Sequence, residues 1–231
     1  MKKLGLVGGL GPESTVMYYR GILEGTAAAL GSDVLPQLTI ESLNVFEVFR
    51  LCTAGRLDEL AEYIGGAVAR LAAAGCEVAA ITANTPHIVY GQVAAASPIP
   101  VVSVVEATRD AAVAARVRRV GLLGTEFTMA NDFFSRPFAE VGIEVVTPND
   151  AEMALIQERI ATELELGIVR EETRREFVAV IDNLRERAQI EQVILGCTEL
   201  PLILDDAVSP VPCLDTAAIH IEALVRAIVT A

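Results

Sequence analysis

The sequence is poor in the residues that hold metal ions. It has no tryptophan, two histidines and four cysteines. The histidines are far apart in the sequence and no two cysteines form a CxxC pair, so a zinc site is not expected. Four cysteines in 231 residues are too few for a disulfide scaffold, which predicts a reduced, cytoplasmic protein. These residues are His87, His220, Cys52, Cys76, Cys197 and Cys213.

Positive charge is also scarce. The chain has 18 Lys and Arg against 31 Asp and Glu, a net charge of −13, and its only lysines are Lys2 and Lys3. A protein that binds a phosphate backbone needs a basic face, and an anionic membrane also attracts basic rather than acidic surfaces. No apolar run approaches the ~20 residues that cross a bilayer. We therefore expect neither nucleic acid nor membrane as a partner, whereas a small acidic substrate would need local cationic or N–H groups.

What the chain does have is a hydrophobic composition and an alternating pattern. With 231 residues and 52% hydrophobic residues, it can bury one large core or two smaller ones, and it is not disordered. Short apolar runs alternate with amphipathic segments, which predicts an α/β fold with parallel sheets flanked by helices. We expect strands at 3–7, 38–41, 77–81, 101–104, 120–123, 143–146 and 192–195. We expect helices from a cap at Ser14 or Thr15 to about 30, then at 57–74, 107–117, from about 130, 151–167, 171–188 and 216–229.

An internal repeat suggests two related lobes. Residues 5–8 (GLVG) resemble residues 121–124 (GLLG), and residues 83–85 hold the same place after a strand as residues 197–199. Any two α/β units look somewhat alike, but the near-equal offsets favour two pseudo-symmetric lobes. We predict lobe 1 at 1–100, joined by a C-terminal helix at about 210–231, and lobe 2 at 101–209. Ligands of such folds bind beyond the carboxyl ends of the strands, which predicts a site in the cleft between the lobes.

Cys197 is the best candidate for chemistry. It follows an apolar strand and Gly196, at a turn where N–H groups and a helix N-terminus favour a thiolate. A buried cysteine at a strand end can also be a small hydrophobe. The other three cysteines lack this context and are interpreted as packing residues.

Polar and glycine residues at the other turns could bind a carboxylate. Backbone N–H groups near Gly8, Gly9 and Gly11 could cradle an anion, although these glycines could equally permit a tight turn. The stretch is neither a Rossmann fingerprint nor a P-loop. Hydroxyl and amide groups near the strand ends can be turn residues or ligands in the same way. They belong to Asn84, Thr85, Thr128 and Thr198.

His87 and Arg50 are weaker candidates. His87 follows Ala83 by four residues and could tune a neighbouring acid or base, although a lone histidine is more often structural. Arg50 follows an apolar stretch, read here as a strand, where it could bind a side-chain carboxylate in a bidentate manner. Most arginines are solvated surface residues, so this is a modest argument for an acidic substrate.

Several motifs together resemble the aspartate/glutamate racemase family. They are residues 8–12 (GGLGP), 84–87 (NTPH), 121–125 (GLLGT), 196–201 (GCTELP), 215–216 (DT) and 219–220 (IH). The resemblance covers nearly the whole chain in the right order. Residues 8–12 and Glu199-Leu200 are closer to the aspartate-racemase branch than to the cell-wall glutamate racemases.

The resemblance implies a cofactor-independent isomerase. Members of the family use neither pyridoxal phosphate nor a metal, and two cysteines on opposite faces of an amino acid remove and return its α-proton. Fixed donors must stabilise the carbanion-like transition state. On this basis Cys197 is the acid/base on the L-face, His87 and Glu199 support the site, and a homodimer is expected. The substrate-binding residues would be Gly9, Leu10, Gly11, Arg50, Asn84, Thr85, Thr125, Thr128 and Thr198.

The sequence departs from the family at one important position. Ala83 stands where the first catalytic cysteine, or threonine in a subgroup, is expected, and alanine cannot carry a proton. The lysine that some members place in the second lobe also has no counterpart near Leu164. Three explanations stay open for Ala83: a substitution made to trap substrate, a natural variant in which water or Thr82 replaces the base, or one-sided chemistry.

These explanations define the alternatives to racemisation of aspartate or glutamate. A single-cysteine decarboxylase of the same superfamily has one cysteine in the second lobe and a small residue opposite. A catalytically dead amino-acid-binding protein would keep ligand affinity without proton exchange. The intact residues 8–12 and 84–85 favour the racemase.

Overall fold

The computed structural model describes residues 1–230 and divides the chain into two compact units. Unit 1 comprises Met1–Ala107 and the C-terminal segment that begins at Ala217, and unit 2 comprises Thr108–Thr216. The segment that follows unit 2 in the sequence therefore belongs to unit 1.

Unit 1 is built on a parallel sheet of four strands in the order β2-β1-β3-β4. The central strands, β1 and β3, are buried along their whole length. A strand covered on both faces needs apolar side chains at every position, which explains its continuous hydrophobic run. The strands are β1 Leu4–Gly8, β2 Leu38–Ser42, β3 Val78–Ile81 and β4 Val101–Val102.

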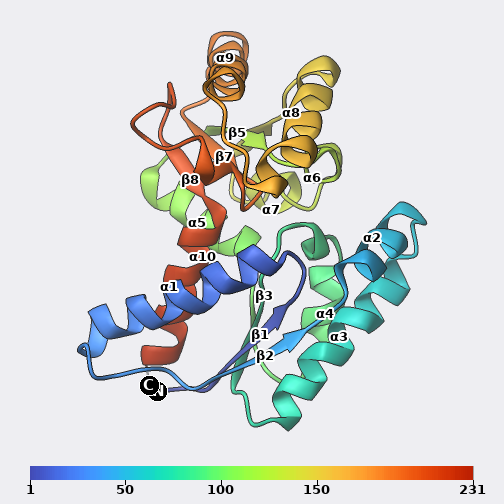
Figure 1. Ribbon diagram of the computed structural model, residues 1–231, viewed down its shortest axis with the longest axis vertical. Coiled ribbons are helices and arrows are strands. Elements are labelled where there is room, and N and C mark those ends of the chain that lie inside the picture. The colour runs from blue at the N-terminus through green and yellow to red at the C-terminus, as the bar shows by residue number, and fades with distance from the viewer. Residues whose placement is uncertain (231) are drawn as a thin grey trace. The chain divides into compact units, whose positions relative to one another are not determined.

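Helices cover both faces of this sheet. α1 (Pro12–Leu30) and α10 (Thr216–Val229) lie on one face, while α3 (Leu57–Ala73) and α4 (Tyr90–Ala96) lie on the other (Figure 1). Each face has its own hydrophobic core. The remaining helical segments of unit 1 are α2 Val45–Thr53 and the 3₁₀ turn η1 Thr85–Val89.

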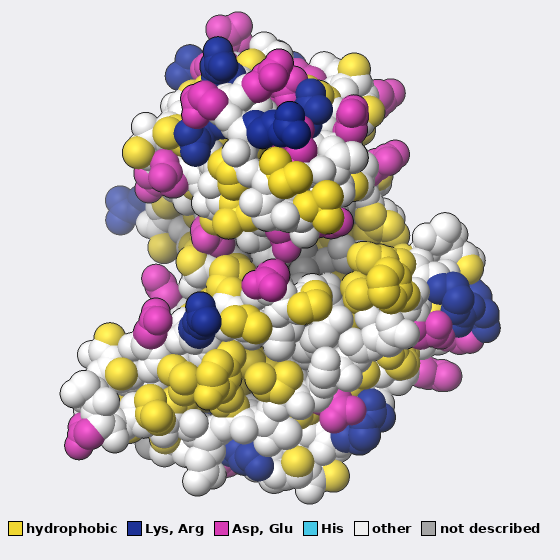
Figure 2. All heavy atoms as spheres, viewed as in Figure 1, with side chains coloured by type: hydrophobic (Ala, Val, Ile, Leu, Met, Phe, Trp, Pro, Cys, Tyr) yellow, Lys and Arg dark blue, Asp and Glu magenta, His cyan; other side chains and the backbone are white. Residues whose placement is uncertain are grey.

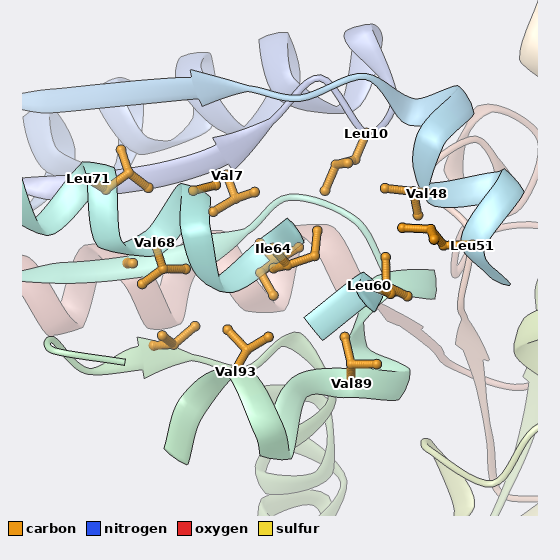
Figure 3. Packing of buried hydrophobic residues seen from close by; sticks show 14 of the residues in the cluster. Val7, Leu10, Val48, Leu51, Leu60, Ile64, Val68, Leu71, Val89 and Val93 are labelled. Atoms are coloured by element: carbon orange, nitrogen blue, oxygen red, sulfur yellow. The ribbon is translucent and has the colours of Figure 1, made fainter. Parts of the chain in front are cut away.

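The hydrophobic core beneath α3 contains side chains from β1, α3, α4 and α2. Val7 of β1, Ile64 and Val68 of α3 and Val93 of α4 point toward one another, and all four are buried (Figure 3). Burying a side chain of this size contributes about 1.5–3 kcal/mol. This core fixes the carboxyl ends of β1 and β3, from which the loops of the candidate site emerge.

Unit 2 repeats the same topology, with strand order β6-β5-β7-β8 and parallel pairing throughout. Val7 pairs with Ile81 in unit 1 as Leu123 pairs with Leu195 in unit 2, so Ala83 and Cys197 hold equivalent positions. The prediction of two related parallel sheets flanked by helices is confirmed. The strands are β5 Arg119–Leu123, β6 Glu144–Val146, β7 Gln192–Leu195 and β8 Cys213–Asp215. The helical segments are α5 Val104–Ala115, α6 Glu126–Ala130, α7 Ser135–Ala139, α8 Asp150–Thr162, η2 Leu164–Leu166, α9 Glu171–Ala188 and η3 Leu200–Leu202.

Four local predictions were wrong. α1 begins at Pro12, because proline suits the first helical turn, so neither Ser14 nor Thr15 is its cap. β4 ends at Val102, since α5 already begins at Val104. The segment expected to be a turn at 124–128 contains α6, and α2 forms where Arg50 was expected to follow a strand.

Charges of both signs are distributed over unit 2. Figure 2 shows Lys or Arg and Asp or Glu side chains interspersed where α8 and α9 lie, and the ion pair of Arg159 with Glu176 joins these two helices. Such alternation is typical of a solvated helix surface. Within residues 1–230, no helix is both long and apolar enough to cross a membrane.

Candidate active site

In unit 1 the candidate residues follow β3. Ala83 is partly buried against the core, and Asn84 is buried at the start of η1, where its carbonyl accepts a hydrogen bond from the His87 N–H at 2.9 Å. Pro86 within η1 suits the tight turn because proline fixes its backbone angle. The chain therefore turns sharply at the carboxyl end of β3, which brings Asn84 and Thr85 to that edge of the sheet.

His87 holds this turn through its side chain. Its Nδ1 lies 2.9 Å from the Ala83 carbonyl oxygen, and its Nε2 accepts the Val104 N–H at 3.2 Å. Nε2 can accept only without a proton, so the neutral ring carries its hydrogen on Nδ1 and donates it to Ala83. Burial lowers the pKa of His87 to about 4. His87 is thus a neutral positioning residue at physiological pH.

A second buried histidine lies behind the first. His220 of α10 stands 6.4 Å from His87 between ring centroids. Its Nδ1 lies 2.9 Å from the Tyr18 hydroxyl, and its Nε2 lies 3.0 Å from the Val102 carbonyl. Burial, followed by the charge that His87 can carry, lowers the pKa of His220 to about 3. Sequence reasoning gave no role to Tyr18 or His220, because their separation in the chain hides the contact.

The glycine loop after β1 uses one of its predicted N–H donors internally. Gly9 has φ = +75° and donates its N–H to Thr15 Oγ1 at 2.9 Å. A Cβ at Gly9 would lie 2.3 Å from the Leu43 carbonyl oxygen, so both the backbone angle and the space require glycine. Leu10 packs in the core beneath α3. A tight turn is therefore the structural role of Gly9, and anion binding by Gly9, Leu10 and Gly11 stays a prediction.

Thr82 is committed to the sheet. It is fully buried, and its hydroxyl donates to the Val7 carbonyl at 3.1 Å, while its own carbonyl accepts a hydrogen bond from Ser14 Oγ at 2.6 Å. These contacts agree with the expectation that strand alternation turns Thr82 away from the residues at 83–85.

In unit 2 the equivalent turn carries Cys197. Gly196 precedes it, and a Cβ there would lie 2.8 Å from the Leu123 carbonyl oxygen. Only glycine allows this close approach of β7 and β5, which fixes the start of the turn. Thr125 caps α6 by accepting the Thr128 N–H at 3.3 Å, and the two hydroxyls lie 3.1 Å apart. Thr128 is buried, whereas Thr125 is partly exposed.

The Cys197 thiol contacts a carboxylate. Its Sγ lies 2.9 Å from Glu199 Oε2, and Thr198 Oγ1 lies 2.9 Å from each Glu199 oxygen. Burial raises the pKa of Cys197 well above its usual range, and the charge of Glu199 raises it further. The expectation that this turn favours a thiolate is therefore wrong: burial and a neighbouring carboxylate outweigh the turn.

A second carboxylate, that of Glu165, also affects the pKa of the Cys197 thiol. Glu165 belongs to η2, and burial together with the charge of Glu199 raises its pKa. Glu165 in turn raises the pKa of Cys197. Sequence reasoning missed Glu165 although it adjoins Leu164, where a lysine was sought, because an acidic residue was not considered there.

Arg50 lies in α2 and not after a strand. Its guanidinium forms an exposed bidentate pair with Glu47, with distances of 2.9 Å from Nε to Oε2 and 2.6 Å from Nη2 to Oε1. An i,i+3 pair of this kind is weak, so it can open for another carboxylate. A substrate contact by Arg50 stays a prediction.

The remaining cysteines are buried or partly buried. Cys76 is buried in the core beneath α3, and partial burial raises the pKa of both Cys52 and Cys213. Of the part of the chain that the structure describes, no group of three or more His, Cys, Asp or Glu side chains is placed to hold a metal ion.

Comparisons with known proteins agree with these motifs. A sequence model described as "Asp/Glu/Hydantoin racemase" matches residues 7–224. The broad specificity amino-acid racemase RacX of Bacillus subtilis is 23% identical over 218 residues, which are 93% of this chain and 93% of RacX.

Solved structures give the same result at higher identity. The structure of a putative Asp/Glu racemase from Yersinia pestis superposes with a TM-score of 0.92 at 34% identity, covering 98% of this chain and 99% of that chain. An aspartate racemase homologue from Pyrococcus horikoshii superposes with a TM-score of 0.85 at 37% identity, again covering 98% and 99%. Both matches extend through the two units.

Proposed function

This chain belongs to the Asp/Glu/hydantoin racemase family, and from that premise we propose that it moves the α-proton of an amino acid without pyridoxal phosphate or a metal. The observation that carries the proposal is the Cys197 thiol, which lies at the carboxyl end of β7 beside the Thr198 hydroxyl and the Glu199 carboxylate.

The chemistry requires a base strong enough to remove a weakly acidic proton. As a thiolate, Cys197 would take the α-proton from the L-enantiomer and leave a carbanion-like centre, and as a thiol it would return that proton. Hydroxyl and amide donors would stabilise the charge that develops on the substrate carboxylate. We propose this role for Asn84, Thr85, Thr125, Thr128 and Thr198.

Ala83 limits what the chain can do as it stands. It occupies in unit 1 the position that Cys197 occupies in unit 2, and its methyl group cannot exchange a proton. We propose that the unaltered chain catalyses one-sided exchange and that racemisation is impaired at position 83. A decarboxylase is the second candidate, and Ala83 is the observation that favours it, since protonation from one face needs one thiol.

Aspartate and glutamate are the proposed substrates. The family comprises Asp/Glu/hydantoin racemases, the Yersinia pestis protein is a putative Asp/Glu racemase, and the Pyrococcus horikoshii protein is an aspartate racemase homologue. Arg50 supplies a cation that could bind the acidic side chain. RacX, by its name, has broad specificity, so neutral amino acids belong in the same assay.

Proton NMR in D₂O tests the proposal. L- and D-aspartate, L- and D-glutamate and two neutral amino acids are supplied separately, with Cys197→Ser as the control. Loss of the α-proton signal from L-enantiomers only, abolished in the control, supports one-sided chemistry by Cys197. Inversion would show that water or Thr82 replaces the missing base. No exchange with any substrate, together with loss of CO₂ from a substituted malonate, would replace the racemase proposal by the decarboxylase.

A further inference from the structure

Glu199 contacts the reacting atom of the proposed reaction directly. Its Oε2 lies 2.9 Å from Cys197 Sγ, and it also accepts the Thr198 hydroxyl, so two donors point at one carboxylate. An ionised carboxylate is an acceptor only, and the thiol must therefore be the donor in this pair. The resting arrangement has the proton on sulfur and the negative charge on Glu199.

We infer that Glu199 is the proton acceptor for Cys197, so that the working acid/base of unit 2 is a thiol–carboxylate pair. The inference rests on the proposed function and deepens it. Three steps would follow in order. First, the S–H bond breaks and the proton moves to Glu199 Oε2, which leaves a thiolate. Second, the thiolate takes the substrate α-proton, and the electron pair of the C–H bond stays on the substrate. Third, the thiol, its proton exchanged with solvent, protonates the substrate carbon, and the Glu199 acid returns its proton to the resulting thiolate.

The surroundings explain why a partner is needed. Burial is the main cause of the raised pKa of Cys197. The carboxylates of Glu199 and Glu165 raise that pKa further, whereas a hydrogen bond to the backbone of Glu199 lowers it. A thiol in such a place does not ionise toward bulk water at neutral pH. Transfer to Glu199 leaves the net charge of the pair unchanged, which makes it less costly than moving the proton out of the site. The α-ammonium group of an amino acid would also offset the two carboxylates.

A comparison of Glu165 with Glu199 distinguishes proton acceptance by Glu199 from a purely electrostatic effect on the thiol. The charge of Glu165 raises the pKa of Cys197, yet it is Glu199 that accepts the hydrogen bond from the thiol. Removing either charge should favour the thiolate. Only the removal of Glu199 also removes the base. The two variants therefore have opposite expected effects on catalysis if Glu199 accepts the proton, and the same effect if it does not.

The experiment compares Glu199→Gln with Glu165→Gln. Gln is close in size to Glu and can still accept a hydrogen bond, but it cannot take up a proton. The first measurement is the pH titration of thiolate absorbance, with Cys197→Ser subtracted. The second is the initial rate of α-proton exchange of L-aspartate as a function of pH.

We expect both variants to ionise Cys197 at lower pH than the unaltered chain. Exchange near pH 7 should fall by about 100-fold or more in Glu199→Gln, the usual size of a lost general base. Its residual rate should rise with pH as the thiol ionises toward water. Exchange in Glu165→Gln should equal or exceed that of the unaltered chain, because the base is still present.

Exchange in Glu199→Gln that equals or exceeds that of Glu165→Gln would overturn the inference and leave the proposed function intact. No exchange in the unaltered chain would overturn the proposed function, and the role of Glu199 with it. If Glu199→Gln does not fold by circular dichroism, Glu199→Asp replaces it. The shorter carboxylate should lower exchange by about tenfold and keep the pH dependence of the unaltered chain, and an unchanged rate would overturn the inference.

Discussion

The side chain of His87 holds the carbonyl of Ala83, with 2.9 Å between Nδ1 and the oxygen. The residue at position 83 is therefore fixed in space although its own side chain is inert. The backbone at this turn is held in place, but the alanine side chain has no group that can give or take a proton.

Restoring that group should restore the second half of the reaction. We expect Ala83→Cys to convert exchange of L-aspartate into exchange of both enantiomers with inversion, measured by NMR and circular dichroism. The double variant Ala83→Cys/Cys197→Ser should exchange the D-enantiomer only. The matched control is Ala83→Ser, which keeps the size but is a poor base. Exchange limited to L-aspartate in Ala83→Cys would contradict this prediction.

The two buried histidines should make stability depend on pH. Burial lowers the pKa of His87 to about 4 and that of His220 to about 3, so the unfolded chain binds more protons below the ordinary value of 6.5. Stability contributed by these groups is complete above pH 6.5 and falls as the pH decreases toward 4. The free energy of unfolding should fall by about 1 kcal/mol per histidine between pH 7 and pH 5.5.

Urea unfolding at pH 7 and 5.5 measures this loss. The variant His220→Gln removes one titrating group, so its loss of stability between the two pH values should be about half that of the unaltered chain. Its stability at pH 7 should also fall, because the Tyr18 hydroxyl loses an acceptor. An unchanged difference between the two pH values would contradict the prediction.

Gly196 should be intolerant of any side chain. Alanine there would place Cβ 2.8 Å from the Leu123 carbonyl oxygen, so the strands or the Cys197 turn must shift. We expect Gly196→Ala to lower the free energy of unfolding by about 1–3 kcal/mol and the rate of α-proton exchange by at least tenfold. Gly65 of α3 is the matched control, because no atom from outside its own helix lies within 4 Å of its Cβ position. Gly65→Ala should gain about 0.5–1 kcal/mol from helix propensity.

Arg50 offers a test of the acidic substrate. If it binds the side-chain carboxylate, Arg50→Gln should raise the KM for exchange of L-aspartate about tenfold and leave neutral amino acids unaffected. Glu47→Gln is the control, since it frees Arg50 from its present partner and should leave the KM equal or lower. Equal KM values for aspartate in Arg50→Gln and the unaltered chain would remove Arg50 from the site.

Much of the fold could be predicted because its central strands carry their own signal. The strands around Leu6 and Ile194 are buried on both faces, so they appear as apolar runs bounded by glycine or proline. α2 was missed because its apolar residues resemble a strand, although Asn44 accepts the Phe46 N–H as a normal helix cap.

The location of the candidate site was predictable from the sequence, whereas the protonation state of its thiol was not. The internal repeat located Ala83 and Cys197 at equivalent strand ends. The protonation of Cys197 depends first on burial, which no motif encodes, then on Glu199, and to a smaller extent on Glu165, which is distant in sequence. The support of Ala83 by His87 was hidden for the same reason, because the Val104 N–H that fixes the imidazole follows another strand.

The close approach of α10 to α1 has a consequence for synthesis. Gly25 leaves so little room that a Cβ there would lie 2.8 Å from Val225 Cγ2, and Gly21 meets Ile221 in the same way. α10 leaves the ribosome after residues 108–216, which emerge as an uninterrupted block. Unit 2 can therefore finish folding while α1 alone covers its face of the first sheet, and unit 1 is completed only when α10 packs beside α1.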